Sequence, residues 1–433
     1  MRMYNQYVAL HVAKLVVPKQ SARAQDMPSS SIRQMFKAVE RIRDGGEEVI
    51  PLHIGDPDFP LPSRITAAVN SAMALGRTHY SPAAGIERLR EAAARHSAGR
   101  LGLPFTAAPA LAPAALSPQH VVCSQGATHA LNACLQLACN IGDTILLPEV
   151  HFPNYLQQAA LAGVRARLYP LDAHFQPRLD ALEQTLDDSV RALLINTPGN
   201  PAGALFAPDT IRALYDFARR HNLWIISDEA YIDYVYHGEH LSPLQVDWEQ
   251  SSEQRRVLGV FSFSKSYAAT GLRCGWTLCP YVGAARRLGL MNEPLIGCMS
   301  TPLQWGMVAA LAEDDTAGRR ASLNDRRLLA AEVLNDHGFE VRPVDGGMFY
   351  FVDISATGLS SDEFADALLA EEHVAVVPGS GFGLQPRYGD DGRLEFTASP
   401  LAARHVRICF AIDPELLADG LSRLARFIRR HSR

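Results

Sequence analysis

The sequence predicts an α/β protein with a large domain, built on a mostly parallel doubly wound sheet, and a smaller α+β domain. Two observations predict this fold class. Between residues 120 and 280, apolar runs typical of buried strands alternate with helical patterns, and such alternation produces parallel sheets covered by helices. The chain also has 433 residues, of which 47% are hydrophobic and 20% charged. That length exceeds the usual size of one domain and favours a second, smaller one.

The domain boundaries are predicted from the same patterns. We expect residues 21–58 and 322–433 to form the small domain, residues 59–321 the large domain, and residues 1–20 an N-terminal extension. The extension carries an apolar run interrupted by His11 and Lys14, without a small-residue cleavage pattern. It is a poor signal peptide and too short to cross a bilayer. We expect it to pack on its own or a neighbouring subunit, with a disordered tail as the alternative.

Composition narrows the partners and the compartment. The net charge of −5 is spread without a basic block, which argues against nucleic acid or an anionic membrane and favours a small-molecule substrate. Seven cysteines without a Cys-x-x-Cys pair argue against a disulfide framework and fit a reducing, cytoplasmic location. The fifteen histidines are scattered without the spacing of metal ligands, so no metal site is predicted.

The N-terminal half is predicted to alternate helices with strands. Hydrophobic spacing and Gly/Pro punctuation predict a helix at 30–46, a short strand at 49–58, helices at 61–76 and 85–101, a surface linker at 104–118, a strand at 120–125 and a helix at 130–140. Gly126, Ala127 and Thr128 open that last helix. A strand that turns through glycine into a helix presents free N–H groups suited to a phosphate, although such turns are also common without any ligand.

The C-terminal half continues with strands that lead into the smaller domain. Apolar runs predict strands at 144–150, 193–196, 223–229, 341–354, 374–377 and 405–411, and helices at 322–337, 361–371 and 415–430. Residues 383–404 form a long, polar, glycine-containing connection. It is expected to be either a lid that shapes specificity or a surface insertion.

Lys265 is the candidate around which the chemistry is organised. It is the only lysine between residues 38 and 433 and follows the buried run Val257–Phe261. A lysine amine can lose its proton when it is desolvated and then bond to an aldehyde, which arginine cannot do. Ser262 and Arg273 could meet one phosphate while the amine meets the aldehyde, a combination that describes pyridoxal phosphate. A surface lysine on a turn is the alternative.

The motif Ser-Phe-Ser-Lys, followed eight residues later by Arg273, resembles the cofactor-lysine signature of class I/II aminotransferases. This is the aspartate-aminotransferase-like, fold-type I family of pyridoxal-phosphate enzymes, and the resemblance covers roughly residues 21–430. It implies that pyridoxal 5'-phosphate is bound by Lys265 and that Gly126, Ala127 and Thr128 cup its phosphate. It further implies that Phe152 stacks on the ring. Tyr80, in Tyr-Ser-Pro-Ala-Ala-Gly, is implied to reach the phosphate of a neighbouring subunit, so we expect a homodimer with shared active sites.

The same resemblance assigns the remaining site residues. Asn200 lies in Asn-Pro-Ala-Gly, where Ala202 replaces the family's threonine, and is implied to contact the ring oxygen and the substrate carboxylate. Asp228 ends a predicted strand, where α/β folds bind ligands, and is implied to pair with the ring nitrogen. Tyr231 is implied to contact the ring oxygen. Arg407, in an apolar strand where a cation needs an anion, is implied to bind the substrate carboxylate together with Gly55.

These residues predict an aminotransferase of amino acid metabolism or biosynthesis, acting on an L-amino acid and a 2-oxo acid. Two alternatives stay open at this point. A pyridoxal-phosphate lyase or cyclase would carry the same residues, because the early chemistry is shared. An aminotransferase-like effector domain of a transcription regulator would need a DNA-binding segment, for which the N-terminal extension is expected to be too short. The sequence does not identify the side chain of the substrate.

Overall fold

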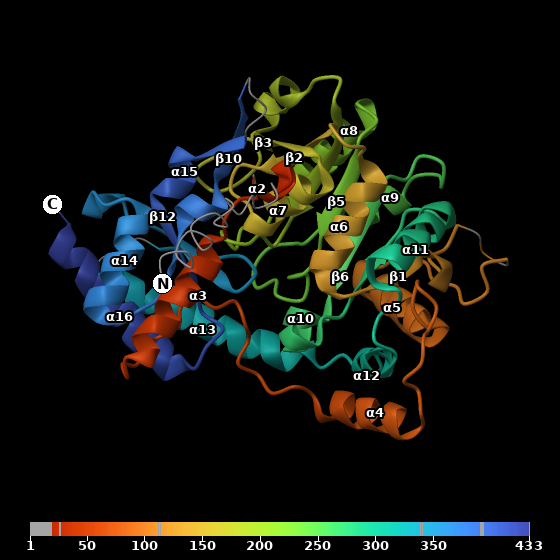
Figure 1. Ribbon diagram of the computed structural model, residues 1–433, viewed down its shortest axis with the longest axis horizontal. Coiled ribbons are helices and arrows are strands. Elements are labelled where there is room, and N and C mark those ends of the chain that lie inside the picture. The colour runs from red at the N-terminus through yellow and green to blue at the C-terminus, as the bar shows by residue number, and fades with distance from the viewer. Residues whose placement is uncertain are drawn as a thin grey trace, which may run out of the picture.

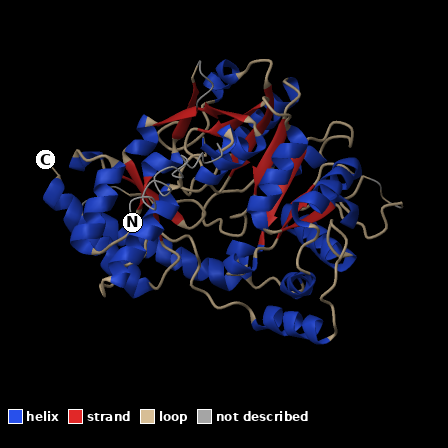
Figure 2. Ribbon diagram, in the orientation of Figure 1, coloured by secondary structure: helices blue, strands red, loops and turns tan. Residues whose placement is uncertain are grey.

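The computed structural model describes residues 20–25, 27–110, 112, 114–337, 339, 341–389 and 394–432. Residues 1–19 of the predicted N-terminal extension lie outside the described residues. Figure 1 shows a large domain beside a smaller one, and Figure 2 shows that helices surround the strands of both. No helix of the described part is long and apolar enough to cross a bilayer.

The large domain is built on a seven-stranded sheet. Its strand order is β1-β7-β6-β5-β4-β2-β3. The strands are β1 (Val121–Ser124), β2 (Thr144–Pro148), β3 (Arg165–Tyr169), β4 (Val190–Asn196), β5 (Trp224–Asp228), β6 (Val257–Ser262) and β7 (Gly275–Leu278). Only β7 runs antiparallel to its neighbours β1 and β6, so the predicted mostly parallel sheet is confirmed.

Both faces of this sheet are covered. Successive side chains of a strand point to opposite faces, and in β4 Leu193 and Ile195 lie in one hydrophobic core while Ala192 and Leu194 lie in another. The first core receives α4 (Ser63–Ala74), α5 (Glu87–Leu101), α8 (Pro208–Arg220), α9 (Pro243–Trp248) and α12 (Thr301–Leu311). The second receives α6 (Gly126–Ala138), α7 (Pro153–Ala162) and α11 (Val282–Ile296). The sheet is therefore doubly wound.

The small domain packs four helices around a three-stranded antiparallel sheet. In this sheet β12 (His405–Cys409) lies between β8 (Phe349–Asp353) and β9 (Val377–Pro378). A third core joins these strands to α3 (Ser31–Asp44), α13 (Thr316–Asp336), α14 (Ser361–Glu372) and α16 (Pro414–His431). Helix α13 begins at Thr316, earlier than the predicted residue 322. The limits assigned to the two domains stay a prediction.

The predicted strand at 49–58 is wrong. Only one isolated bridge forms in this segment, between Ile50 and Val374, and the rest is an irregular turn. Pro51 and Pro57 have no N–H to donate to a ladder, which explains the loss of pairing. The strand predicted at 341–354 is shorter, because β8 begins only at Phe349.

The described residues of the segment 383–404 form two paired strands followed by a short helix. Strands β10 (Leu384–Tyr388) and β11 (Leu394–Ala398) pair antiparallel, and α15 (Pro400–Ala403) leads into β12. The Tyr388 hydroxyl accepts a hydrogen bond from the Ala166 N–H of β3 at 3.0 Å. Arg165 of β3 lies over the Tyr388 ring. The hairpin therefore docks on the edge strand of the large sheet, which protects that edge from pairing with other chains.

Candidate active site

Lys265 lies in the turn that follows β6. The Ser262 hydroxyl accepts a hydrogen bond from the Ser264 N–H at 3.1 Å and caps the short helix α10 (Phe263–Ser266). The Lys265 amine donates to the Gly55 carbonyl at 2.5 Å. Burial, assisted by Arg407 and Arg273, lowers the pKa of this amine to about 8. A substantial fraction of the amine is therefore neutral near pH 8, as a nucleophile or a base requires.

The irregular turn at residues 53–55 connects Lys265 with Arg407. The His53 carbonyl accepts from Arg407 at 2.7 Å, and the Gly55 carbonyl accepts from Lys265. A Cβ at Gly55 would lie 2.8 Å from the Phe349 ring. Glycine is needed because the backbone approaches that ring so closely.

Asp228 ends β5, next to β6 in the sheet. Its side chain is 6% exposed. One carboxylate oxygen accepts from the Tyr155 hydroxyl at 2.8 Å and the other from the Ala230 N–H at 3.0 Å. Burial raises the pKa of Asp228 to about 6, although the Tyr155 hydrogen bond and the nearby Lys265 charge oppose the shift. The site thus holds a buried carboxylate that is ionised at neutral pH and suited to a cationic ring nitrogen.

Arg407 lies in the middle of β12 and is 2% exposed. Its guanidinium donates to the Asn200 side-chain oxygen at 3.0 Å and to the His53 carbonyl. The guanidinium carbon lies 4.3 Å from the centre of the Phe349 ring and 5.0 Å from that of Phe382. Burial lowers its pKa to about 10, so it remains a cation at neutral pH. Its Nε–H is buried without a partner in the described structure, and a substrate carboxylate could accept that hydrogen bond.

Asn200 and Tyr231 complete the wall between Asp228 and Arg407. The Asn200 N–H donates to the Asn196 side chain at 3.0 Å, which fixes the loop after β4. The Tyr231 ring meets Phe349 edge-on, with the ring centres 5.8 Å apart. Burial raises the pKa of Tyr231 against the effect of Arg407. Its phenol therefore stays neutral and can donate a hydrogen bond to a ligand oxygen.

The start of α6 and Arg273 form a cradle suited to a phosphate. Gly126 has φ of 74°, and a Cβ there would lie 2.8 Å from the Arg273 guanidinium. No side chain caps the first turn, which contains Ala127 and Thr128. Arg273 donates to the Thr270 carbonyl at 2.8 Å, and no carboxylate of the described residues forms an ion pair with it. A helix N-terminus beside a cation without a counter-ion fits the phosphate of the predicted cofactor.

The structure brings most of the predicted residues together. Hydrogen bonds connect Gly55 with Lys265 and Asn200 with Arg407, and Phe152 packs edge-on against Tyr155, 5.7 Å between ring centres. Tyr80 differs, because it is 96% exposed on the loop between α4 and α5. Nothing within one subunit therefore tests its predicted role.

Sequence reasoning missed residues that act on the predicted ones. Tyr155 binds Asp228, and Phe349 and Phe382 flank Arg407. The Ser264 hydroxyl lies 3.5 Å from Arg273. The only sequence signal for Tyr155 is its position three residues after Phe152, the residue that precedes α7. No local pattern indicates the contacts of Phe349 and Phe382, because their partner Arg407 is distant in sequence.

Comparisons with known proteins agree with this geometry. The family model for aminotransferase class I and II matches residues 47–424. The chain is 32% identical to the arginine–pyruvate transaminase of Pseudomonas aeruginosa, over 90% of this chain and 92% of that protein. It is 30% identical to the aromatic-amino-acid aminotransferase 2 of Thermococcus litoralis, over 94% and 98% of the two chains. The crystal structure of aspartate aminotransferase from Thermotoga maritima superposes with a TM-score of 0.82 at 27% identity, over 95% and 100% of the chains.

Proposed function

The chain belongs to the class I and II aminotransferase family of pyridoxal-phosphate enzymes, and we propose that the residues around Lys265 carry out its transamination. The observation that carries this proposal is the convergence of three buried ionisable groups. Lys265, with a lowered pKa, and Arg407 both donate to the turn at residues 53–55, and Asp228 ends the neighbouring strand. The relatives are named as aminotransferases, so a lyase or cyclase is not favoured.

The geometry supports one arrangement for the cofactor. Asp228 would hold the ring nitrogen, Phe152 the face of the ring, and Asn200 and Tyr231 the ring oxygen. Gly126, Ala127, Thr128, Ser262 and Arg273 would hold the phosphate. Pyridoxal phosphate bound there supplies an aldehyde for the amino group and a ring that spreads negative charge left by loss of a proton.

The protein's own groups would bind the amino acid and move its proton. Arg407 and Asn200 hold the substrate carboxylate, and the free Nε–H of Arg407 gives the guanidinium a further donor for it. The neutral Lys265 amine accepts the α-proton and then returns it to a different carbon, so one group serves as base and as acid. The Gly55 carbonyl orients the amine between these positions. The rings of Phe349 and Phe382 exclude water from Arg407 and strengthen its attraction for the carboxylate.

We extend the proposal to a homodimer with shared active sites. Tyr80 is 96% exposed, and the nearby Met73 and Leu75 are 55% and 66% exposed. Large side chains exposed together on one segment are typical of a surface covered by a partner. The seven cysteines form no disulfide, which supports the proposed cytoplasmic location. A role in amino acid biosynthesis is proposed from the reaction alone.

A half-reaction experiment tests the proposed function. The purified holoenzyme is mixed with arginine, aspartate or phenylalanine, the amino acids suggested by the names of the relatives, and the cofactor absorbance is followed. We expect at least one of them to change the spectrum and release its 2-oxo acid, and added pyruvate or 2-oxoglutarate to reverse the change. Release of ammonia without any need for a 2-oxo acid would instead identify a lyase.

A further inference from the structure

A cleft of about 1090 Å³ lies between the two domains, beside the site just described. Ala202 and Ala204 line both this cleft and the small hollow that contains Asn200 and Tyr155. The large domain contributes the loops after β3, β4 and β5, and the small domain contributes α13, β8 and the start of β12. Lys265, Asp228 and Arg407 do not line the cleft, so it is a separate space.

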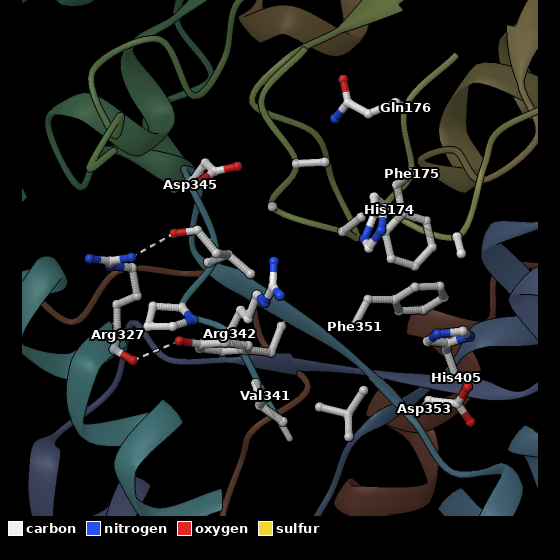
Figure 3. Close-up of a pocket in the computed structure, with 18 of the residues that line it drawn as sticks. His174, Phe175, Gln176, Arg327, Val341, Arg342, Asp345, Phe351, Asp353 and His405 are labelled. Carbon is white, nitrogen blue, oxygen red and sulfur yellow. Dashed lines mark hydrogen bonds between the residues drawn. The ribbon is translucent and has the colours of Figure 1, made fainter. Parts of the chain in front are cut away.

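One exposed cation and one half-buried anion in this cleft form no ion pair with the described residues. Arg342 makes no hydrogen bond or ion pair with the described residues, and the Asp345 carboxylate accepts no hydrogen bond from them. Figure 3 shows both side chains at the cavity. Burial raises the pKa of Asp345, although His237 and Arg327 oppose the shift. Other charged side chains of the cleft have partners: Arg404 pairs with Asp353 at 3.5 Å, and Arg327 donates to the Val344 carbonyl at 2.8 Å.

An aromatic wall faces these two charges. The rings of Phe351 and His405 stack with centres 4.8 Å apart and an interplanar angle of 14°. Phe175 leans against both, at 5.6 Å and 5.5 Å, and Figure 3 shows the three rings on one side of the cavity. Burial lowers the pKa of His405, so this ring is neutral at pH 7. Phe351 and His405 are only 8% and 6% exposed and Phe175 is half-buried, so Phe175 presents most of the uncharged surface available to a planar apolar group.

We propose that the cleft is a second amino-acid site, which binds a zwitterionic α-amino acid with an aromatic side chain. Arg342 binds the carboxylate, Asp345 binds the ammonium group, and the side chain packs on the wall of Phe175, Phe351 and His405. The inference goes beyond transamination, because it concerns binding at a cleft that Lys265 does not reach. A zwitterion offers one charged group to each of these side chains, whereas a ligand with a single charge can engage only one of them. The volume is in the range of small-molecule sites.

The test uses α-methyl-L-phenylalanine, which has no α-hydrogen and cannot be transaminated. Binding is measured by isothermal titration calorimetry on the holoenzyme of Arg407→Gln, which lacks the guanidinium proposed to bind the carboxylate at the first site. We expect one site to remain. We expect Arg342→Gln or Asp345→Asn, added to that background, to weaken its binding at least 10-fold, while Arg287→Gln on the exposed face of α11 leaves it unchanged.

Ligand and protein controls keep the outcome decisive. 3-Phenylpropionate lacks the ammonium group and 2-phenylethylamine lacks the carboxylate, and each should bind at least 10-fold more weakly than α-methyl-L-phenylalanine. Asp345→Glu is the control for misfolding, because it keeps the negative charge that Asp345→Asn removes. If the Asn variant loses binding because the charge is lost, the Glu variant should still bind the ligand. Binding that disappears in Arg407→Gln, or that ignores both cleft substitutions, overturns the proposal. The half-reaction of the wild-type enzyme reports separately on transamination.

Discussion

The candidate active site and the cleft between the domains differ in how their charged groups are held. At the candidate active site the charged side chains are buried or half-buried and each has a hydrogen-bond partner. Lys265 is bonded to Gly55, Asp228 to Tyr155 and Arg407 to Asn200. In the cleft, about 1090 Å³ is open, and Arg342 and Asp345 form no ion pair with the part of the chain that the structure describes.

This difference shows that volume does not identify the catalytic site. Chemistry requires groups whose pKa values are shifted and whose positions are fixed by their neighbours. Burial moves the pKa of Lys265 to about 8 and that of Asp228 to about 6, whereas Arg342 is exposed. The tight site therefore suits reaction, and the open cleft suits reversible binding.

Replacing Lys265 should have the largest effect on activity of the substitutions considered. Lys265→Ala removes the proposed base and the proposed covalent attachment point, so we expect kcat to fall about 10³-fold or more, since proton transfer by a positioned group contributes about 10²–10⁴-fold. Turnover and the mass of the denatured protein after borohydride reduction measure the two losses. Lys37→Ala, on the exposed face of α3, should change neither. A variant at position 265 that keeps substantial turnover would remove the basis of the proposed site.

Two arginines that lie three residues apart, Arg404 and Arg407, allow the active site and the cleft to be tested separately. Arg407 is buried and bonded to Asn200, whereas Arg404 is exposed and lines the cleft. We expect Arg407→Gln to lower kcat/KM for an amino acid about 10²-fold, since a hydrogen bond to a charged group contributes about 1.5–3 kcal/mol. The loss should appear mainly in KM. Arg404→Gln breaks only an exposed ion pair with Asp353 and should alter kcat/KM less than twofold. Equal effects at both positions would contradict the assignment of Arg407.

Tyr155→Phe tests whether the hydrogen bond from Tyr155 to Asp228 affects the pH dependence of activity. The hydrogen bond from Tyr155 lowers the pKa of Asp228 against the effect of burial, so its loss should raise this pKa above about 6. The proposed role of Asp228 requires its ionised form. As the solution is acidified, Tyr155→Phe should therefore lose activity at a higher pH than the wild-type enzyme does. We expect kcat/KM to fall about 10-fold at pH 6 and less at pH 8. The pH profile measures this shift.

Tyr169→Phe is the matched control for Tyr155→Phe. Tyr169 is also buried in the large domain, but its hydroxyl donates to the Leu194 carbonyl at 3.1 Å. Its loss should cost about 1 kcal/mol of stability and leave the pH profile in place. An equal shift of both profiles would mean that the Tyr155 effect is not transmitted through Asp228.

Much of the fold was predictable because its signals are local. The strands around Leu193 and Val257 are continuous apolar runs, as strands covered on both faces must be. Helix α3 has the spacing of an amphipathic helix. The predicted strand at 49–58 failed because its residues contact β8 and β12, which lie about 300 or more residues away in the sequence. The hairpin of 384–398 was not predicted for a similar reason, since it depends on docking to β3.

The residues of the candidate site also fall into those with a local sequence signal and those without one. Lys265 could be selected from its isolation among arginines, and Asp228 from its place at the end of a strand. The roles of Asn200, Tyr231 and Gly55 came from the family resemblance rather than from spacing. Tyr155 and Phe349 were missed because the contacts that give them a role join distant segments. No sequence pattern indicated the cleft. Arg342 and Asp345 are distinguished only by the absence of ion pairs with the described residues, which is visible in the structure and not in the sequence.

The last prediction concerns the cost of burying charge at the catalytic site. The folded pKa of Asp228, about 6, lies above the ordinary aspartate value of 3.8, so the unfolded chain ionises first and the free energy of unfolding falls as pH rises between these values. The full cost is about 3 kcal/mol at pH 8. In Asp228→Asn the new NH₂ can donate to the Tyr155 hydroxyl while the oxygen still accepts from Ala230, so only part of the bonding energy is lost. We expect the cofactor-free variant to be about 1 kcal/mol more stable than wild type at pH 8 and no more stable at pH 5, by urea unfolding.

Asp247 is the matched control for Asp228, because it is a buried aspartate outside the candidate active site. It is also buried, and burial raises its pKa. Its two oxygens accept from the backbone N–H groups of Arg256 at 2.8 Å and Val257 at 3.2 Å. A backbone N–H cannot reverse its direction, so an Asn side chain at this position leaves one donor unsatisfied, and Asp247→Asn should cost about 2 kcal/mol. Opposite signs at the two positions would show that the charge of Asp228 is kept for the reaction, whereas Asp247 is kept because its two acceptor oxygens bind backbone N–H groups. Destabilisation of equal size at both would mean that Asp228 is primarily structural.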